Sequence, residues 1–364
     1  MSMYKKEGLI RMDQNTNYSA TNRTVRDKLR EIIKEQNWMK YPDPTGFQEL
    51  KDLVLEDMGI EGDVEITAGA TPALELVFRA LLDKYDEIIT TDPGYLMIDG
   101  LAERYGKVVR VDVWKERKLT MEHIFKHITP NTKMILLVDP TNPFGEAYTR
   151  EEIKEIASFA NEAGLIVLHD ITYKDFTDEH YKVAAYAPHN TITVFSFSKT
   201  YGLAGLRIGG IITTPERMKQ LRPHVIDTLG VNAIAQEMAI AGLEDKDRII
   251  TQVRAETRAS RDYLIEEFRK LGYRIRNRSE ASMMVVEVPN TIKVTDIDKA
   301  LSDQGIYIRA GTYTSKLHGE QYFRVSFSQP LWKTMKFMDA FKETHAYLLR
   351  RNEFLDIIKQ VRGI

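Results

Sequence analysis

The 364-residue chain contains no cysteine. This absence excludes disulfides, thiolate metal sites and cysteine nucleophiles, so any chemistry has to use other side chains. Basic residues are not in excess either, because 51 lysines and arginines stand against 53 acidic residues, for a net charge of -2. The charge balance therefore gives no reason to expect binding to nucleic acid or another polyanion.

Long apolar segments are also lacking. No run approaches the roughly 18 apolar residues that would span a membrane, and the charged N-terminus lacks the apolar region of a secretory signal. We therefore expect a cytoplasmic protein that does not enter a membrane. The chain is long enough for one large domain and one smaller domain, each with its own core.

Short apolar runs alternate with amphipathic helical segments from residue 64 onward. This alternation predicts an α/β fold with a mostly parallel sheet covered by helices on both faces. Only about ten residues separate the last two runs, too few for a crossover helix, so one of these two strands is expected to run antiparallel. The expected strands are residues 64–67, 87–91, 107–113, 133–138, 165–168, 191–195 and 208–213.

A smaller α+β unit is expected to follow a charged helical stretch at residues 244–271. Its strand candidates are residues 283–288, 306–309 and 322–327, and its helix candidates are residues 294–304 and 332–351. The predicted domains are an N-terminal segment packing with the small domain, a large domain and the small C-terminal domain, at residues 1–40, 41–245 and 246–364.

The segment of residues 195–210 combines two serines, one lysine, one arginine and four glycines at the end of an apolar run. Ser196 and Ser198 offer hydroxyls, Lys199 offers an amine, and the planar guanidinium of Arg207 suits phosphate oxygens. The glycine spacing matches neither the dinucleotide fingerprint nor the Walker loop. This set of groups can hold a phosphorylated aldehyde and bind it covalently, although a solvated lysine beside a tight connection explains the segment equally well.

Other polar groups follow the earlier strands, where open α/β sheets bind their ligands. Gly69, Ala70 and Thr71 open a helix whose backbone N–H groups can bind an anion. Tyr95 can stack on a planar ring, and a turn with two prolines holds the amide of Asn142. Each feature alone is also explained by an ordinary turn or core residue.

The fifth strand ends at Asp170, and Tyr173 follows three residues later. A carboxylate at the end of an apolar run needs a cation or a donor, and a protonated pyridine nitrogen would serve. Tyr173 can donate to a ring oxygen, although a tyrosine at the core boundary is as compatible. His169 has no second histidine at ligand spacing, so no metal site is predicted. Together, the strand ends predict a site for pyridoxal 5'-phosphate.

The chain resembles the class I and II aminotransferases, which are fold type I pyridoxal-phosphate enzymes, and residues 196–209 fit the lysine signature of that family. The resemblance implies a mostly parallel central sheet in a large domain beside a smaller α+β domain. It also implies that Lys199 forms the Schiff base, that Asp170 keeps the ring nitrogen protonated, and that Tyr173 and Asn142 contact the phenolic oxygen. The other implied cofactor contacts are Gly69, Ala70, Thr71, Tyr95, Ser196, Ser198 and Arg207.

The turn of Tyr41, with the sequence Tyr-Pro-Asp-Pro, is similar to one in histidinol-phosphate aminotransferases. There the tyrosine reaches the cofactor phosphate of the neighbouring subunit, so the resemblance implies a homodimer. The aspartate and aromatic amino-acid branches fit this turn as well. Where many relatives have an Asn-Phe pair, this chain has Ser282 and Met283.

Substrate contacts are implied by the same resemblance. Arg324 matches the arginine that grips the substrate carboxylate, or the substrate phosphate in the histidinol-phosphate branch, and Arg309 resembles a second anion-binding arginine. Asn17 and Tyr18, in an asparagine-rich N-terminal loop, are also expected to bind substrate.

The implied activity is transfer of an amino group between an amino acid, or an amine like histidinol phosphate, and a 2-oxo acid, expected to be 2-oxoglutarate. Decarboxylation, elimination, cyclisation and oxidation stay open at this point, because they depend on which substrate bond lies perpendicular to the cofactor ring. A non-enzymatic regulator that binds the cofactor is the more distant alternative.

Overall fold

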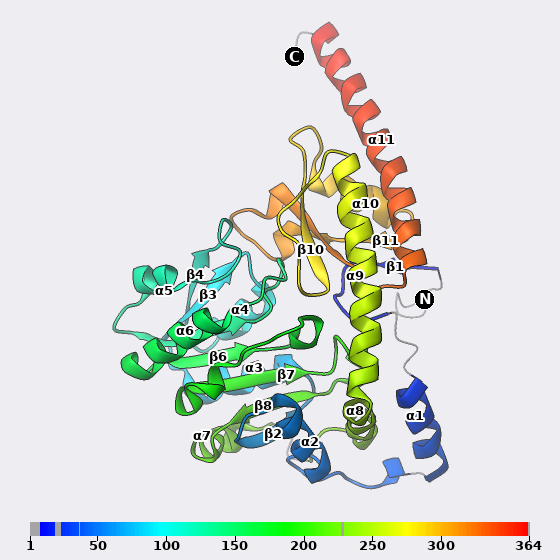
Figure 1. The fold of residues 1–364 in the computed structure, drawn as a ribbon. Helices are drawn as coiled ribbons and strands as arrows, with labels where there is room; N and C mark the ends of the chain where they lie inside the picture. Colours follow the sequence, from blue (N-terminus) through cyan, green and yellow to red (C-terminus); the bar gives the residue numbers. More distant parts are fainter. Residues whose placement is uncertain (1–7, 19–22, 36, 227–228, 363–364) are drawn as a thin grey trace.

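The computed structural model describes residues 8–18, 23–35, 37–226 and 229–362 (Figure 1). Its largest sheet has seven strands in the order β2-β8-β7-β6-β5-β3-β4. Neighbouring strands are parallel, except that β8 is antiparallel to both β7 and β2, as the short connection before it predicts. The strands are β2 (Asp63–Thr67), β3 (Glu87–Asp92), β4 (Lys107–Asp112), β5 (Thr132–Val138), β6 (Ile166–Asp170), β7 (Thr191–Ser196) and β8 (Gly209–Thr213).

Helices cover both faces of this sheet. Alternate side chains of β5 and β6 enter two separate clusters, because Leu136 and Leu168 pack with α3, whereas Ile135, Leu137 and Val167 pack with α6. The helices around the sheet are α2 (Gln48–Met58), α3 (Ala70–Leu81), α4 (Leu96–Ala102), α5 (Met121–His127), α6 (Arg150–Ala163), α7 (Pro215–Leu221) and α8 (Ala233–Glu244).

Helix α6 begins with a capping box. The Thr149 side chain accepts a hydrogen bond from the backbone N–H of Glu152, whose side chain accepts one from the Thr149 N–H, which satisfies two backbone donors at the helix start. The short 3-10 helices are η2 (Asn37–Met39), η3 (Lys174–Phe176), η4 (Val183–Ala185), η5 (Pro188–Asn190), η6 (Ala204–Leu206), η7 (Arg222–His224), η8 (Gly311–Tyr313) and η9 (Gly319–Gln321).

A second sheet with four antiparallel strands, in the order β12-β13-β10-β9, lies in the C-terminal part of the chain. Its core is rich in aromatic rings, including Phe268, Phe323 and Phe341. The strands are β9 (Arg274–Ile275), β10 (Met283–Glu287), β12 (Arg309–Ala310) and β13 (Tyr322–Ser326), and the helices are α9 (Lys246–Lys270), α10 (Val294–Ser302) and α11 (Leu331–Arg362).

Two details of this part differ from the sequence-based expectation. The predicted strand at residues 306–309 is divided into β11 (Ile306–Tyr307), which pairs with β1 (Ile10–Arg11), and β12, which pairs with β13. Helix α11 runs eleven residues beyond the predicted end at residue 351, to Arg362, and extends away from the rest of the molecule in Figure 1.

The N-terminal segment contacts both parts of the chain. β1 pairs with β11 beside the four-stranded sheet, whereas α1 (Arg23–Glu35) lies against α8 near the large sheet. Val25 and Ile32 of α1 share a hydrophobic cluster with Met238 of α8. The domain boundaries at residues 40 and 245 stay a prediction.

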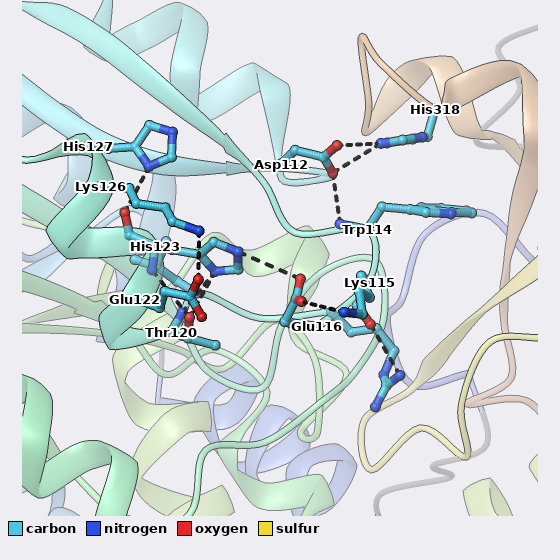
Figure 2. A network of polar contacts seen from close by, with 12 residues as sticks. Asp112, Trp114, Lys115, Glu116, Thr120, Glu122, His123, Lys126, His127 and His318 are labelled. Carbon is cyan, nitrogen blue, oxygen red and sulfur yellow. Dashed lines mark hydrogen bonds and ion pairs between the residues drawn. The ribbon is translucent and has the colours of Figure 1, made fainter.

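Residues 311–321, between β12 and β13, lie against the ends of β3 and β4. The His318 Nε2 is 3.0 Å from both carboxylate oxygens of Asp112, and the His318 ring stacks on Trp114 with centroids 4.8 Å apart (Figure 2). The small sheet is thus tied to the large one beside β4. Within the described ranges, the structure contains no helix with the length and apolarity that crossing a membrane requires.

Candidate active site

A cavity of about 340 Å³ lies at the carboxyl ends of β5, β6 and β7. Parallel strands bring their ends to one edge of the sheet, so side chains far apart in the sequence meet there. Twelve of the residues expected at the site line this cavity: Ala70, Thr71, Tyr95, Asn142, Asp170, Tyr173, Ser196, Ser198, Lys199, Arg207, Arg309 and Arg324.

Lys199 lies in the turn after β7 and is half-buried, with its side chain in the cavity. Its Nζ donates a hydrogen bond of 3.2 Å to the backbone oxygen of Gln14 and lies 5.8 Å from the ring centroid of Tyr173. Burial, together with the positive charges of Arg324 and Arg207, lowers the pKa of Lys199 to about 8, although Asp170 opposes the change. A neutral and therefore nucleophilic amine is accessible near physiological pH.

Asp170 ends β6 and is buried. Among the described residues, the hydrogen bonds to its carboxylate all go to one oxygen, Oδ1, which accepts from the backbone N–H of Thr172 at 3.0 Å and from the Thr172 hydroxyl. Burial raises the pKa of this carboxyl, against the hydrogen bonds from Thr172 and the charge of Lys199. A buried acid in this state favours a cationic partner in the cavity, and a protonated ring nitrogen has that chemistry.

Tyr173 and Asn142 are each held by a second residue. The Asn15 Nδ2 donates to the Tyr173 hydroxyl oxygen at 3.1 Å, and an Arg324 NH group donates to the Asn142 Oδ1 at 2.9 Å. Both contacts occupy an acceptor oxygen. Neither the Tyr173 O–H nor the Asn142 NH2 group donates a hydrogen bond to the residues that the structure describes, so both can act as donors toward an anionic oxygen in the cavity.

Hydrogen-bond donors gather at the end of the cavity that is lined by the start of α3, the end of β7 and Arg207. Arg207 adopts a left-handed backbone conformation, with φ of 56°, and donates to the Ala68 backbone oxygen at 3.1 Å. Gly69 precedes α3 with φ of 94°, and a Cβ atom there would lie 2.6 Å from the Arg207 guanidinium. With the hydroxyls of Ser196 and Ser198 and the N-terminus of α3, this end suits a phosphate group.

Arg309 and Arg324 lie directly opposite each other on β12 and β13. Arg324 is only 3% exposed and donates to the Asp13 backbone oxygen at 2.7 Å, while Arg309 donates to the Asp13 carboxylate at 3.0 Å. The Nε atoms of both arginines are buried and have no hydrogen-bond partner among the described residues. Two cations with unused donors at one wall favour an anionic ligand. Arg309 also lies over the ring of Tyr313, 4.3 Å from its centroid.

Four residues of the expected site lie outside this cavity wall. Tyr41 is 83% exposed, in the turn before α2. Asn17 donates to the Thr200 backbone oxygen at 2.9 Å, and Asn17 and Tyr18 line a neighbouring hollow beside α1. Gly69 is not in the wall, but it permits the close approach of Arg207. The roles expected for these residues stay predictions.

The N-terminal loop contributes residues to the site that the sequence pattern did not indicate. It was expected to be a polar loop, but its side chains are largely buried against the cavity and the 198–200 turn. The sequence feature that could have indicated these residues is the close spacing of Asp, Asn and Thr, whose side chains can form hydrogen bonds with backbone groups. The additional lining residues with polar side chains are Asp13, Gln14, Asn15, Thr16, Thr172 and Tyr313.

His169, the residue before Asp170 in β6, is fully buried in a cluster that the sequence spacing did not indicate. The Asp139 Oδ2 is 3.4 Å from the His169 Nε2 and 3.0 Å from the His180 Nε2, a geometry that a metal ion could also use. The His169 Nδ1 accepts from the Val183 backbone N–H, so its Nε2 carries the proton. Burial acts to raise the pKa of Asp139, but the two histidines outweigh it and lower that pKa. Among the described residues, neither the His169 Nε2 nor the Asp139 Oδ2 makes a hydrogen bond, so their contact is electrostatic.

This chain is similar to known proteins over most of its length. The family described as aminotransferase class I and II matches residues 7–335. An aspartate aminotransferase of Pyrococcus horikoshii is 26% identical over 330 residues, which cover 85% of this chain and 84% of that protein. A histidinol-phosphate aminotransferase of Methanococcus aeolicus is 28% identical over 350 residues, which cover 92% of this chain and 90% of that protein.

Solved structures have the same fold. An aromatic aminotransferase from Pyrococcus horikoshii superposes with a TM-score of 0.84 at 22% identity, covering 95% of this chain and 96% of that one. A double mutant of the Thermus thermophilus aspartate aminotransferase gives a TM-score of 0.83 at 24% identity, covering 92% of this chain and 91% of that one.

Proposed function

Because the chain belongs to the class I and II aminotransferases, enzymes that use pyridoxal 5'-phosphate, we propose that it transfers the amino group of an amine with an anionic side group to 2-oxoglutarate. The observation that carries this choice of donor is the pair of arginines, Arg309 and Arg324, which line the same cavity as Lys199 and whose buried Nε atoms have no hydrogen-bond partner in the part of the chain that the structure describes. The named relatives act on different donors, so the family alone does not select one.

The residues around the cavity fit the cofactor. Ser196, Ser198 and Arg207 would bind its phosphate, and Asp170 would pair with its ring nitrogen. Tyr173, with Asn142, would donate to its ring oxygen. When bound, the cofactor supplies an electron sink for the pair released at the substrate α-carbon.

Lys199 would hold the cofactor through its amine and would then carry the proton. A pKa of about 8 leaves part of the amine neutral near pH 7, and only the neutral form can take the proton from the substrate α-carbon at Nζ. The proton is then held within the cavity by the same nitrogen, which avoids exchange with water.

Arg324 grips the first anionic group of the substrate. Its guanidinium is already oriented by Asn142 and by the Asp13 backbone oxygen, so little side-chain freedom is lost on binding. The Arg324 Nε is available for one oxygen of a carboxylate or phosphate.

Arg309 binds the second group of the donor. The Asp13 carboxylate neutralises one side of its guanidinium and is itself shared with Arg11 at 2.8 Å. Two arginines around one carboxylate leave a net positive charge at this wall, which favours a second carboxylate of the substrate. A donor with a single phosphate, such as histidinol phosphate, is the alternative, since both arginines could bind one doubly charged group.

The test is a half-reaction with one amino donor at a time, followed by the absorbance of the cofactor as it changes to its amino form. We expect aspartate or glutamate to react at much lower concentrations than alanine or phenylalanine. Histidinol phosphate as the preferred donor would select the alternative. Absence of conversion with every donor would contradict transamination.

Substitution of the second arginine tests the assignment of the side-group site. Arg309→Gln is expected to raise KM for a dicarboxylic donor about tenfold or more and to leave KM for alanine within about twofold. Arg11→Gln is the matched control, because it removes a charge from the same Asp13 but does not line the cavity. An equal effect of Arg309→Gln on both donors would exclude specific binding of the side group.

We further propose that the protein is a homodimer in which Tyr41 reaches the cofactor phosphate of the other subunit. We also propose that the dimer acts in the cytoplasm. Large apolar side chains are exposed just before Tyr41 in the chain, at Trp38 and Met39, and Ile226 is exposed as well. Gly230 approaches the backbone of Asp43, so the start of the segment that leads to α8 lies beside the turn of Tyr41. An exposed apolar surface of this kind supports contact with another protein surface.

A further inference from the structure

Asn15, in the N-terminal loop, has an unusual backbone conformation. It is 2% exposed and has a φ of 51°, in the left-handed region. Among the described residues other than glycine, only Arg117 and Arg207 share a positive φ, and of these three Asn15 and Arg207 line the cavity. Left-handed backbone is unfavourable for most side chains and is maintained where surrounding contacts fix it, often at functional sites.

The contacts that fix Asn15 come from the small sheet. Its backbone N–H donates to the Ser326 Oγ at 2.8 Å, and the Ser326 hydroxyl in turn donates to the Asn15 Oδ1. The Ser282 hydroxyl donates to the Asn15 backbone oxygen at 3.2 Å. These bonds determine which way the carboxamide points, because its oxygen is occupied by Ser326.

The other end of the carboxamide contacts the catalytic tyrosine of the proposed mechanism. The Asn15 Nδ2 donates to the Tyr173 hydroxyl oxygen at 3.1 Å and lies 2.8 Å from the Met283 sulfur. An amide nitrogen can only donate, so the Tyr173 oxygen accepts. Ser282 and Met283, where this chain departs from the Asn-Phe pair of many relatives, therefore both contact Asn15.

Several charged and titratable groups act on the Tyr173 hydroxyl. Burial raises its pKa, while Arg324 and the hydrogen bond from Asn15 lower it, and Asp170 and Tyr313 raise it. Lys199 lies over the ring face. In this set, Asn15 is the residue that bonds to the phenol oxygen directly, so it sets the direction of the Tyr173 O–H.

We propose that Asn15 is a positioning residue that fixes the Tyr173 hydroxyl as a donor to the ring oxygen of the cofactor. The inference rests on the proposed cofactor site. By occupying a lone pair of the Tyr173 oxygen, the carboxamide turns the O–H toward the cavity and polarises it. The same loop holds Lys199 through the Gln14 backbone oxygen, so one loop orients both groups.

The test is a pH titration of the visible absorbance of the holoenzyme. A strong donor to the ring oxygen stabilises its anionic form and holds the midpoint of the titration at low pH. Asn15→Gly keeps the left-handed backbone and removes the carboxamide, so we expect the midpoint to rise by on the order of half a pH unit. Asn15→Asp places an acceptor against the Tyr173 hydroxyl and is expected to raise it further.

Tyr173→Phe decides whether the effect passes through the tyrosine. In that background, Asn15→Gly is expected to produce no further shift, because the donor that it orients is absent. Ser282→Ala is the matched control, since it loosens the same loop without touching the bond between Asn15 and Tyr173, and should leave the midpoint unchanged. Cofactor affinity, measured by titrating the apoprotein, should weaken in parallel with the midpoint shift.

Two results would overturn the inference: an unchanged midpoint in both Asn15 variants, or an equal shift with and without the Tyr173 hydroxyl. Asn15→Asp is nearly isosteric, so it remains informative if Asn15→Gly does not fold. A wild-type protein without visible absorbance in the presence of the cofactor would instead contradict the proposed function, before any variant is compared.

Discussion

Lys199 is the residue whose chemistry depends most on its surroundings. Burial and the charges of Arg324 and Arg207 lower its pKa from 10.5 to about 8. In the proposed mechanism only the neutral amine would bind the cofactor, and the neutral fraction grows as pH rises through that pKa. We predict that the rate of covalent cofactor binding by the apoprotein rises with pH, with a midpoint near 8, as measured by stopped-flow absorbance.

Arg324→Gln provides the control for this pH dependence. Removal of a nearby cation relieves repulsion of the protonated lysine, so the midpoint should move to higher pH. A wild-type midpoint near the ordinary value for lysine would contradict the argument, because it would mean that the amine is as well solvated as in a free peptide.

Gly69 is the residue that allows Arg207 to reach its position. A Cβ atom at residue 69 would lie 2.6 Å from the guanidinium, and the φ of 94° disfavours any side chain. We predict that Gly69→Ala lowers the free energy of unfolding by about 2 kcal/mol and weakens cofactor affinity about tenfold or more, as measured by urea unfolding and apoprotein titration.

Gly205→Ala is the matched control for that substitution. Gly205 lies in the same connection between β7 and β8 as Arg207. An added Cβ atom at residue 205 would meet no heavy atom within 4 Å. Its effect on both measurements should be small. If the two alanine variants had the same effect on stability and cofactor affinity, the close approach of Gly69 to Arg207 would not be needed for binding the cofactor phosphate.

At the scale of elements, the segment of residues 311–321 joins the two sheets and carries Tyr313 to the cavity. Asp92, buried at the end of β3, accepts from the Ser315 hydroxyl and from the Lys316 backbone N–H at 2.9 Å. Asp92→Ala leaves both donors unpaired, so we predict a loss of about 2 kcal/mol in the free energy of unfolding and a larger change in substrate KM than in kcat.

The exposed contact of the same segment is the comparison. Asp112 is half exposed where it meets His318 (Figure 2), so Asp112→Asn should cost less than about 1 kcal/mol. An equal loss in the two variants, or an unchanged KM in Asp92→Ala, would show that the buried anchor does not hold the segment at the cavity.

The sequence predicted the elements of the large sheet well for a physical reason. Strands buried on both faces are short β-branched runs, and the antiparallel direction of β8 follows from the length of the connection before it. The division between β11 and β12 was not predictable, because it depends on pairing with β1, nearly 300 residues earlier in the chain. The local pattern of residues does not determine with which distant strand a segment pairs.

At the scale of the whole molecule, the same limit applies to the site. Residues at strand ends were identifiable because parallel strands bring their carboxyl ends together. Asp13 and Asn15 were not, since their place in the cavity depends on contacts with β12, β13 and Tyr173, at least 158 residues away. The positions of Asp13 and Asn15 in the cavity depend on how the N-terminal loop packs against residues of both sheets.

The dimer is the prediction that concerns the molecule as a whole. Met39 is 72% exposed and Tyr41 is 83% exposed beside it, in a turn held in place by Gly46 against Ile66. Sedimentation of the wild-type protein should give a dimer, and Met39→Asp should shift it toward monomer, because a charge would be buried in the interface. Tyr41→Phe should remain dimeric and bind the cofactor about tenfold less tightly.

Mixing two variants tests whether Tyr41 acts across the interface. Lys199→Ala subunits lack the amine but keep Tyr41, and Tyr41→Phe subunits keep the amine. In a mixed dimer, one site combines the intact Lys199 of one subunit with the intact Tyr41 of the other. Cofactor affinity and activity of that site should therefore return to the wild-type level after subunit exchange. Full activity in a monomeric wild-type protein, or no recovery in a mixture with proven exchange, would mean that each subunit builds its phosphate site alone.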